Sequence, residues 1–414
     1  MTAPGRARSL VDGLRHLAWL HRRRVIAYAV IWITVALAGY LIDLSRQTVD
    51  GLTDGDGRPF GDDFVNFWSA AYLAMQGQAS TIYDLAGFHR FHTDLLGAEP
   101  KWYHYSYPPT LPLLLAPIGL LPYVPGLFVW LLGSAAGFAA GLAAVLPRRQ
   151  AILAAAATPA LFVSFCGGQN GPLTAALLGG GLSVLARWPA LAGVLFGLLS
   201  FKPQLGLLLP LALLAGREWR AFGWAAATVV IVAAASVLAY GPEIWLAYAE
   251  QASLLRTVVL ERDEGFWFRM PSTFATARMW GVETAMAYGL QAAVGLTAAA
   301  CVVAAWWTDC RRTTKYSMLV IGSLMVTPYV ADYDMTVLTF VLAWRLAELP
   351  ERPFLPWEKL SLVLLLMTPL LAAPMGKYLH VQPALLALYF GFWMQCRIAL
   401  AERHRPLKLV PNTV

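Results

Sequence analysis

The sequence predicts an all-α membrane protein, a polytopic bundle of transmembrane helices that forms one domain over residues 1–414. Of the 414 residues, 58% are hydrophobic and only 13% are charged, whereas a soluble domain has about 25% charged residues. Apolar runs of about 18 to 20 residues recur along the chain, and a helix needs this length to cross a bilayer. Lys and Arg gather in short clusters between these runs, which is the pattern that orients membrane proteins.

Composition also excludes several classes of function. The net charge of +7 is spread over separate clusters, so no continuous basic face is visible and we expect no nucleic-acid partner. The four cysteines lie inside or at the ends of apolar runs, with spacings that fit neither a disulfide framework nor a zinc site; they are Cys166, Cys301, Cys310 and Cys396. We expect no metal and no cofactor.

The apolar runs predict about twelve membrane segments. The first, 25–43, follows a basic cluster and is too long for the hydrophobic core of a signal peptide, so we expect an uncleaved helix. Two segments, 189–201 and 203–216, are too short to cross a bilayer and should form a broken or re-entrant pair. The others are predicted at 111–146, 150–166, 171–187, 220–240, 284–307, 316–330, 334–347, 358–374 and 382–399.

The basic clusters predict the orientation of the chain. Clusters such as Arg22–Arg24, Arg148–Arg149 and Arg311–Arg312 all fall on one side of the alternating segments, and the positive-inside rule makes that side cytoplasmic. The two large loops, 44–110 and 241–283, then face the other side. We therefore expect a multi-pass protein of the inner (cytoplasmic) membrane, with almost all of its unusual polar residues on the periplasmic, extracytoplasmic side.

The loop 44–110 begins its most unusual stretch with two adjacent carboxylates, Asp62 and Asp63. An amphipathic helix should follow at the membrane interface, because apolar residues recur there at helical spacing. Its dipole would favour ionised carboxylates at the N-terminal end. The alternative is that Asp62 only caps the helix and Asp63 only supports its first turn. A second amphipathic piece near 85–96 carries two histidines but no evident third metal ligand.

Two further places on the outer side contain charged residues with a possible function. Lys202, at the joint of the two short segments, is a charge near or within the membrane, which is costly and usually functional; it would face a lipid phosphate or snorkel to the interface. Arg256, Arg262 and Arg269 alternate with aromatic residues in the loop 241–283. Guanidinium groups suit a phosphate, although an interfacial loop explains this pattern equally well.

Taken in order, these pieces resemble the polytopic glycosyltransferases of family 87, which belong to the GT-C superfamily. The resemblance covers roughly residues 60–350. The matching elements are Asp63-Phe64, Tyr83-Asp84, Tyr107-Pro108-Pro109, Gly168-Gln169-Asn170, Lys202-Pro203-Gln204, Arg217-Glu218-Trp219-Arg220, Thr327-Pro328 and Asp332-Tyr333. One departure is that better-known relatives carry His after the late Thr/Ser-Pro motif, where this chain has Asp332-Tyr333-Asp334.

The resemblance implies an inverting transfer of a hexose, with mannose the first choice, from a polyprenyl-phosphate sugar to a hydroxyl of a lipid-linked or glycolipid acceptor at the bilayer. The general base is then Asp63, with Asp62 the second candidate. The donor and its phosphate are expected to contact Lys202, Arg269, Arg262, Tyr107, Gln169, Asn170 and Gln204. The acceptor or the sugar is expected to contact Asp332, Tyr333, Asp334 and His104.

Two other readings stay open at this point. A transporter or flippase of a lipid-linked sugar would favour internal repeats with broken helices in matching positions, and the Lys202-Pro203 break has no obvious counterpart. A non-catalytic subunit of a membrane assembly would leave Asp62 and Asp63 without a role.

Overall fold

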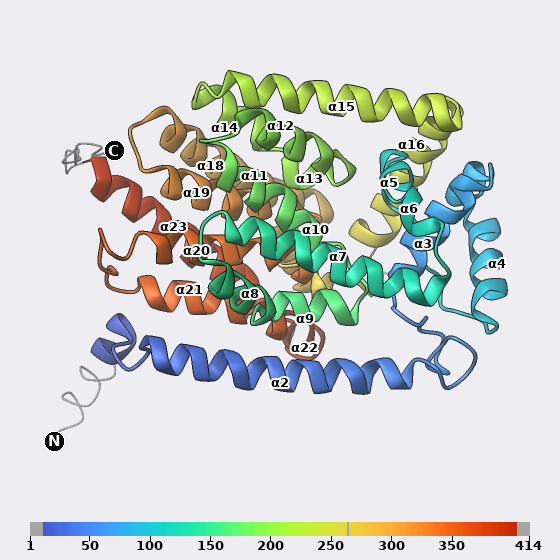
Figure 1. Ribbon diagram of the computed structural model, residues 1–414, viewed down its shortest axis with the longest axis horizontal. Coiled ribbons are helices and arrows are strands. Elements are labelled where there is room, and N and C mark those ends of the chain that lie inside the picture. Colours follow the sequence, from blue (N-terminus) through green and yellow to red (C-terminus); the bar gives the residue numbers. More distant parts are fainter. Residues whose placement is uncertain (1–10, 263–264, 404–414) are drawn as a thin grey trace.

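The computed structural model describes residues 11–262 and 265–403, and within these ranges the chain is helical, with only isolated β-bridges near Thr53. The prediction of an all-α bundle is confirmed. Figure 1 shows the helices packed side by side. The helix α2 (Arg22–Arg46) begins, and α23 (Pro383–Arg403) ends, near one end of the molecule. The helices α3 (Phe64–Met75) and α4 (Leu85–Leu96) lie at the opposite end.

In the described part of the chain, five helices are long and apolar enough to cross a membrane: α2, α7 (Tyr123–Ala143), α15 (Trp219–Tyr240), α18 (Thr284–Trp307) and α23. Two bent pairs raise the number to as many as seven. The pair of α8 (Arg148–Ala156) and α9 (Pro159–Cys166) bends by 56°, and the pair of α21 (Glu358–Met367) and α22 (Pro369–Leu379) bends by 68°. The chain is therefore a multi-pass membrane protein, in which several predicted segments are shorter or more bent than simple spans.

The break at Lys202 is confirmed. The helix α12 (Pro189–Leu198) and the 3-10 turn η3 (Leu199–Phe201) end directly before this residue, and α13 (Pro203–Gly206) and α14 (Leu209–Ala215) follow it. Proline at the start of α13 favours this geometry, because it fixes φ and needs no helical hydrogen bond there. The joint therefore brings irregular backbone and one cation to a place inside the bundle.

The remaining elements are shorter pieces and connecting helices. They are η1 (Ala79–Tyr83), α5 (Thr110–Leu114), α6 (Ala116–Gly119), α10 (Gly171–Ala175), η2 (Ala176–Gly180), α11 (Gly181–Val184), α16 (Glu243–Leu255), η4 (Arg256–Glu261), η5 (Trp267–Arg269), α17 (Thr273–Met279), α19 (Arg312–Val326), η6 (Asp332–Val337) and α20 (Leu338–Ala347).

The two helices of the loop 44–110 differ in their surroundings. In α4, Phe88, His92 and Leu96 are buried while Arg90 and Asp94 are exposed, so the predicted amphipathic character is confirmed. In α3, all residues except Tyr72 and Met75 are buried. The prediction that α3 is an amphipathic helix with one exposed face is wrong, because α5, α6 and α7 pack around it.

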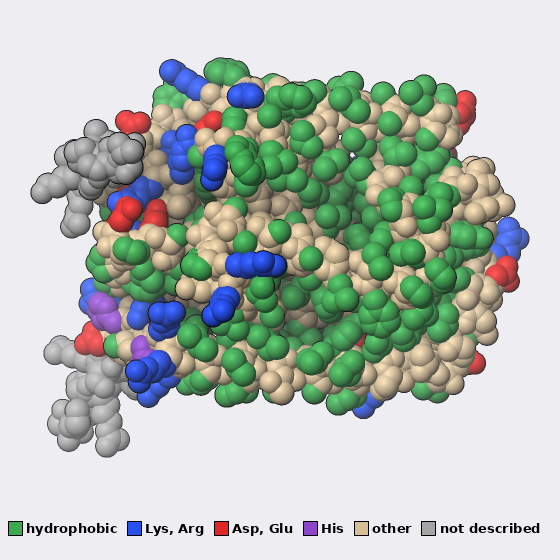
Figure 2. Space-filling view, in the orientation of Figure 1, with side chains coloured by type: hydrophobic (Ala, Val, Ile, Leu, Met, Phe, Trp, Pro, Cys, Tyr) green, Lys and Arg blue, Asp and Glu red, His purple; other side chains and the backbone are tan. Residues whose placement is uncertain are grey.

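The outer surface fits a lipid environment. No residue of α2 is buried, and hydrophobic side chains cover much of the face seen in Figure 2. On that face, Lys and Arg gather mainly over the end where α2 begins and α23 ends. The basic clusters, which the sequence places on one side of the alternating membrane segments, therefore also lie together in space. They lie at the end of the molecule opposite α3 and α4.

Candidate active site

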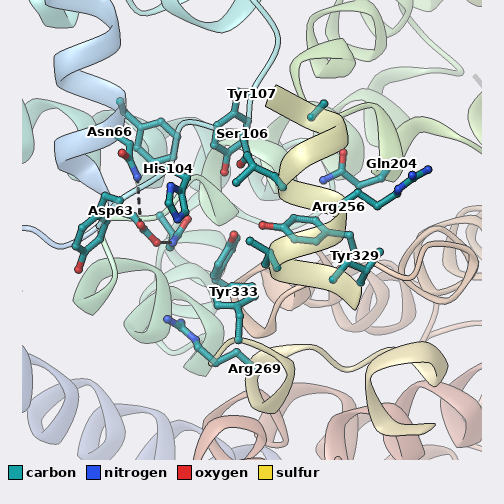
Figure 3. Close-up of a pocket in the computed structure, with 18 of the residues that line it drawn as sticks. Asp63, Asn66, His104, Ser106, Tyr107, Gln204, Arg256, Arg269, Tyr329 and Tyr333 are labelled. Carbon is teal, nitrogen blue, oxygen red and sulfur yellow. Dashed lines mark hydrogen bonds between the residues drawn. The ribbon is translucent and has the colours of Figure 1, made fainter. Parts of the chain in front are cut away.

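A cavity of about 860 Å³ opens between the loop 44–110, the Gly167–Asn170 connection, the Lys202 joint and the loop 241–283. Eight of the predicted site residues line it: Asp62, Asp63, His104, Tyr107, Gln169, Gln204, Arg269 and Tyr333. In Figure 3, Asp63 and His104 lie on one side of the cavity and Gln204 lies on the other. The structure therefore brings together motifs that are far apart in the sequence.

Asp63 is the residue that immediately precedes α3. Its backbone N–H donates to the carbonyl of Gly167 at 3.2 Å. On its side chain, Oδ2 accepts a hydrogen bond from Nε2 of Gln169, and Oδ1 accepts from Nδ2 of Asn66 at 3.4 Å. The carboxylate makes no capping bond to the helix, so the interpretation of Asp63 as mere support for the first turn is wrong.

The electrostatic setting of Asp63 is unusual. Burial, helped by the neighbouring charge of Asp62, raises the pKa of Asp63 from 3.8 to about 7, although Arg269 and the hydrogen bond from Gln169 oppose the shift. No Lys or Arg of the described part of the chain lies within ion-pair distance of this carboxylate, and amide groups supply its hydrogen bonds instead. A carboxyl group in this setting changes charge near neutral pH.

Asp62, by contrast, is neutralised by a cation. Its Oδ2 accepts from Nε of Arg58 at 2.9 Å and its Oδ1 from the hydroxyl of Tyr103 at 2.7 Å. Arg58 also pairs with Asp43, at 2.8 Å. The side chain of Asp62 is thus not a helix cap, and that interpretation is wrong as well. Sequence reasoning missed Arg58, although its spacing of four residues from Asp62 was a usable signal.

Arg269 and Asp332 form a two-bond ion pair. Nε and Nη2 of Arg269 donate to the two carboxylate oxygens of Asp332 at 3.1 and 3.0 Å. Burial lowers the pKa of Arg269, but the charge of Asp332 outweighs it and holds the pKa above its ordinary value. Nη1 has no hydrogen-bond partner in residues 11–262 and 265–403, so one nitrogen of a permanently charged group is available at the cavity wall.

Lys202 lies behind the cavity wall rather than in it. Its Nζ donates to Asp334 at 2.5 Å and to Oδ1 of Asn170 at 3.0 Å, and only 1% of Lys202 is exposed. Nδ2 of Asn170 in turn donates to the hydroxyl of Tyr107 at 2.8 Å. None of Lys202, Asn170 and Asp334 lines the cavity. The ammonium group is directed at Asp334, and the chain of contacts ends at a tyrosine that does line the cavity.

The remaining arginines of the loop 241–283 are separated by the fold. Arg262 is exposed and does not line the cavity. Arg256 does line it, beside Gln204 and on the side away from Asp63. Asn66 and Tyr329 are further lining residues that sequence reasoning did not single out. Asn66 lies three residues after Asp63, which places it on the same face of α3, and this helical spacing was the available signal.

No metal-binding cluster of three or more His, Cys, Asp or Glu side chains occurs in the described part of the chain. The two histidines of α4 have other neighbours. His89 pairs with Glu99 at 2.7 Å and stacks on Trp102 at 4.0 Å between ring centroids, while His92 packs against Phe88.

A sequence model described as glycosyltransferase family 87 matches residues 105–330, more than half of the chain. The matched range includes Tyr107, Gln169, Lys202 and Arg269, which the structure gathers in and behind the cavity wall. No curated protein and no solved structure matches the chain significantly.

Proposed function

The chain belongs to glycosyltransferase family 87, and from this premise we propose that it is an inverting hexosyltransferase with Asp63 as its general base. The donor is a polyprenyl-phosphate sugar, with mannose the first choice. The acceptor is a hydroxyl of a lipid-linked molecule or glycolipid. The reaction takes place on the extracytoplasmic side of the inner membrane, at the end of the bundle that holds α3 and α4, within one domain that spans residues 1–414.

The main support for the proposal is that Asp63 differs from the other carboxylates of the site in its hydrogen-bond and ion-pair partners. Asp62 is paired with Arg58, Asp332 with Arg269, and Asp334 with Lys202. Burial raises the pKa of Asp332 too, but the charge and hydrogen bonds of Arg269 oppose that shift and occupy both of its oxygens. In residues 11–262 and 265–403 the side chain of Asp63 accepts hydrogen bonds from two side-chain amides and has no ion-pair partner, and its pKa is about 7, which suits a base that works near neutral pH.

The acceptor oxygen attacks C1 of the donor sugar and forms the new glycosidic bond while its proton passes to Oδ1 or Oδ2 of Asp63. The bond between C1 and the phosphate oxygen breaks, and polyprenyl phosphate leaves with the electron pair. The configuration at C1 is inverted, so a β-linked mannosyl donor gives an α-mannoside. General-base help of this kind contributes about 10²–10⁴-fold to the rate.

Arg269 is the proposed contact of the departing phosphate. Its Nη1 is available at the cavity wall, and Asp332 fixes the guanidinium plane through the other two nitrogens. A fixed cation stabilises charge that develops on the leaving group without reorganisation during the reaction. Lys202 is a positioning residue in this proposal, since its charge is directed at Asp334 and its hydrogen bonds lead through Asn170 to Tyr107.

The remaining lining residues are the proposed polar contacts of the two sugars. Tyr107, Gln169 and Gln204 are the proposed contacts of the donor, and His104 and Tyr333 are those of the acceptor. All five line the cavity, with Gln204 on the side away from Asp63. Asp332 and Asp334 act indirectly, through their cations. Arg262 has no contact with the cavity and no role in the proposed step.

The test is transfer of labelled mannose from polyprenyl-phosphate-mannose in membranes that contain the chain, beside Asp63→Asn and Asp62→Asn. We expect Asp63→Asn to lose at least about 100-fold in rate, with normal amounts of protein in the membrane, and Asp62→Asn to keep measurable transfer. Equal transfer by all three chains would remove Asp63 as the base. Movement of the labelled lipid across the bilayer without any glycosidic product would instead favour a transporter of a lipid-linked sugar.

A further inference from the structure

Trp102 is a large aromatic residue at the rim of the large cavity. It lines the cavity, yet 57% of it is exposed. Its indole is stacked on the imidazole of His89, with 4.0 Å between the ring centroids and 7° between the planes. His89 is itself held in place, because its Nε2 contacts Glu99 at 2.7 Å and Glu99 also accepts from the hydroxyl of Thr93 at 3.1 Å. We call Trp102, His89 and Glu99 the rim stack.

The chain on either side of Trp102 is also fixed. The backbone N–H of Lys101 donates to the carbonyl of Gly57 at 2.8 Å, and the hydroxyl of Tyr103 donates to Oδ1 of Asp62 at 2.7 Å. Neither the ring nor the backbone of Trp102 therefore needs to be ordered when a ligand binds, which lowers the entropic cost of binding. The second of these contacts ends at the carboxylate that precedes the proposed base.

The rim stack faces water rather than lipid. The side chain of Glu99 is 73% exposed, and a carboxylate in contact with hydrocarbon is costly. Trp280, in the loop 241–283, is also exposed but does not line the cavity, so it is the comparison for a tryptophan that serves only at the membrane interface. The support behind Trp102 and its place in the cavity wall both point to a ligand of the cavity.

Resting on the proposed function, we propose that Trp102 is the stacking platform for a sugar of the acceptor, and that the acceptor is a glycolipid with at least two sugar residues. One face of a pyranose ring carries C–H bonds, and its edge carries hydroxyls. Such a ring matches a flat aromatic face with polar groups around it, here Lys101 and His104 of the cavity lining. The sugar on Trp102 adjoins the one whose hydroxyl faces Asp63.

Exposure separates the platform from the place of the reaction. Asp63 is only partly exposed, whereas more than half of Trp102 is exposed. The ring that stacks on Trp102 therefore lies nearer the opening than the ring that reacts. The donor sugar is bonded directly to the phosphate, whose proposed contact, Arg269, has a side chain that is only 20% exposed. The platform at the open rim is thus left to the acceptor.

The first test identifies the acceptor from the product. Native membranes with and without the chain are supplied with labelled polyprenyl-phosphate-mannose, and the glycan that carries the label is released and sized. We expect a product that depends on the chain and contains the transferred mannose together with two or more sugars of the acceptor. Label bonded directly to a protein, to a lipid hydroxyl or to a single sugar overturns the proposal.

The second test measures the KM for this acceptor and the KM for the donor separately. Trp102→Ala removes the platform, so the acceptor KM should rise at least about tenfold while the donor KM stays unchanged. Trp102→Phe keeps a smaller ring and should give an intermediate acceptor KM. His89→Ala removes only the support of the indole and should raise the acceptor KM by less than Trp102→Ala does. Trp280→Ala is the matched control and should change neither KM. An unchanged acceptor KM in Trp102→Ala, or a rise in the donor KM instead, overturns the proposal.

A third measurement does not depend on turnover. Purified Asp63→Asn is applied to an array of monosaccharides and oligosaccharides, beside Asp63→Asn/Trp102→Ala and Asp63→Asn/Trp280→Ala. We expect Asp63→Asn to bind oligosaccharides, and only the added Trp102→Ala to weaken this binding, by at least about tenfold. Absence of oligosaccharide binding, or binding that Trp102→Ala leaves unchanged, overturns the platform. If binding depends on Trp102 while no chain transfers sugar, the platform stands and the proposed function fails.

Discussion

Gln169 donates a hydrogen bond from its side-chain Nε2 to Oδ2 of Asp63, across 106 residues of sequence. This contact ties the connection between α9 and α10 to the start of α3. It gives the carboxylate a neutral donor where Asp62, Asp332 and Asp334 each have a cation. A neutral donor orients the carboxylate and stabilises its charge only in part, so the group still takes up a proton near neutral pH.

The first prediction concerns the pH profile of transfer. We expect kcat/KM to rise with pH through an apparent pKa of about 7, because Asp63 must be ionised to accept the proton and its pKa lies there. Below that pH the rate should fall about tenfold per pH unit. In Gln169→Leu the ionised form loses a hydrogen bond, so the profile should move to higher pH. A profile that is flat from pH 5 to 8, or one that Gln169→Leu does not move, would contradict the assignment.

The second prediction concerns stability and its dependence on pH. The folded-state pKa of Asp63 is raised above 3.8 to about 7, so the protonated group favours folding at low pH and this contribution is lost as pH rises through about 7. An asparagine at this position does not ionise, so Asp63→Asn avoids the destabilisation that the buried charge causes at high pH. In detergent, its Tm should exceed that of the unmodified chain by more at pH 8 than at pH 5.

Asp62→Asn is the control for this measurement. Asp62 is paired with Arg58, so its loss should lower the Tm at both pH values. If Asp63→Asn lowered the Tm at pH 8 as much as Asp62→Asn does, the raised pKa would be disproved.

The third prediction separates the two roles of Arg269. Arg269→Gln leaves the carboxylate of Asp332 buried without a cation, which costs about 3–5 kcal/mol of unfolding free energy. The double variant Arg269→Gln/Asp332→Asn has no unpaired buried carboxylate, so much of the lost unfolding free energy should return. Transfer should stay at least about 100-fold below that of the unmodified chain, because the phosphate contact is still missing. Recovery of transfer in the double variant would show that Arg269 only holds the fold.

The fourth prediction distinguishes positioning from phosphate contact at Lys202. Lys202→Met leaves the carboxylate of Asp334, which is 1% exposed, buried without a cation. This should lower the free energy of unfolding by about 3–5 kcal/mol. Lys202→Met/Asp334→Asn should recover most of that stability and keep transfer within about tenfold of the unmodified chain, since neither residue lines the cavity. A stable double variant with transfer reduced by more than about 100-fold would restore Lys202 as a direct contact of the phosphate.

The fifth prediction concerns the backbone that supports Asp63. Gly168 has a φ of +59°, and a Cβ there would lie 2.0 Å from the carbonyl oxygen of Gly61 and 2.7 Å from the amide nitrogen of Phe64. Gly168→Ala should therefore displace the start of α3, lowering both Tm and transfer. Gly133→Ala, in α7 with open space around the added methyl, should be neutral or stabilising by up to about 1 kcal/mol. Equal behaviour of the two variants would contradict this account.

The chain's class and its main breaks could be predicted from sequence, because they depend on local composition. The length of each apolar run decides whether a helix can cross a bilayer, and a proline after Lys202 decides where two short helices separate. Asp63 and Gln169 could be singled out for the same reason, since each stands in a short motif, and Arg269 could be singled out because it alternates with aromatic residues in one loop. These predictions needed no knowledge of which segments meet.

The pairing of charges depended on the tertiary structure. Lys202 and Asp334 are 132 residues apart, and Arg269 and Asp332 are 63 apart, so no local pattern shows which cation neutralises which carboxylate. The surroundings of α3 also depended on the tertiary structure. Its amphipathic pattern predicted a helix with one exposed face, but α5, α6 and α7 pack around it. A hydrophobic pattern reports how much surface a segment can bury, whereas the identity of the covering partner depends on contacts between distant segments. Those contacts give Asp63 its amide neighbour Gln169, whereas the arginine that pairs with Asp62 lies only four residues before it.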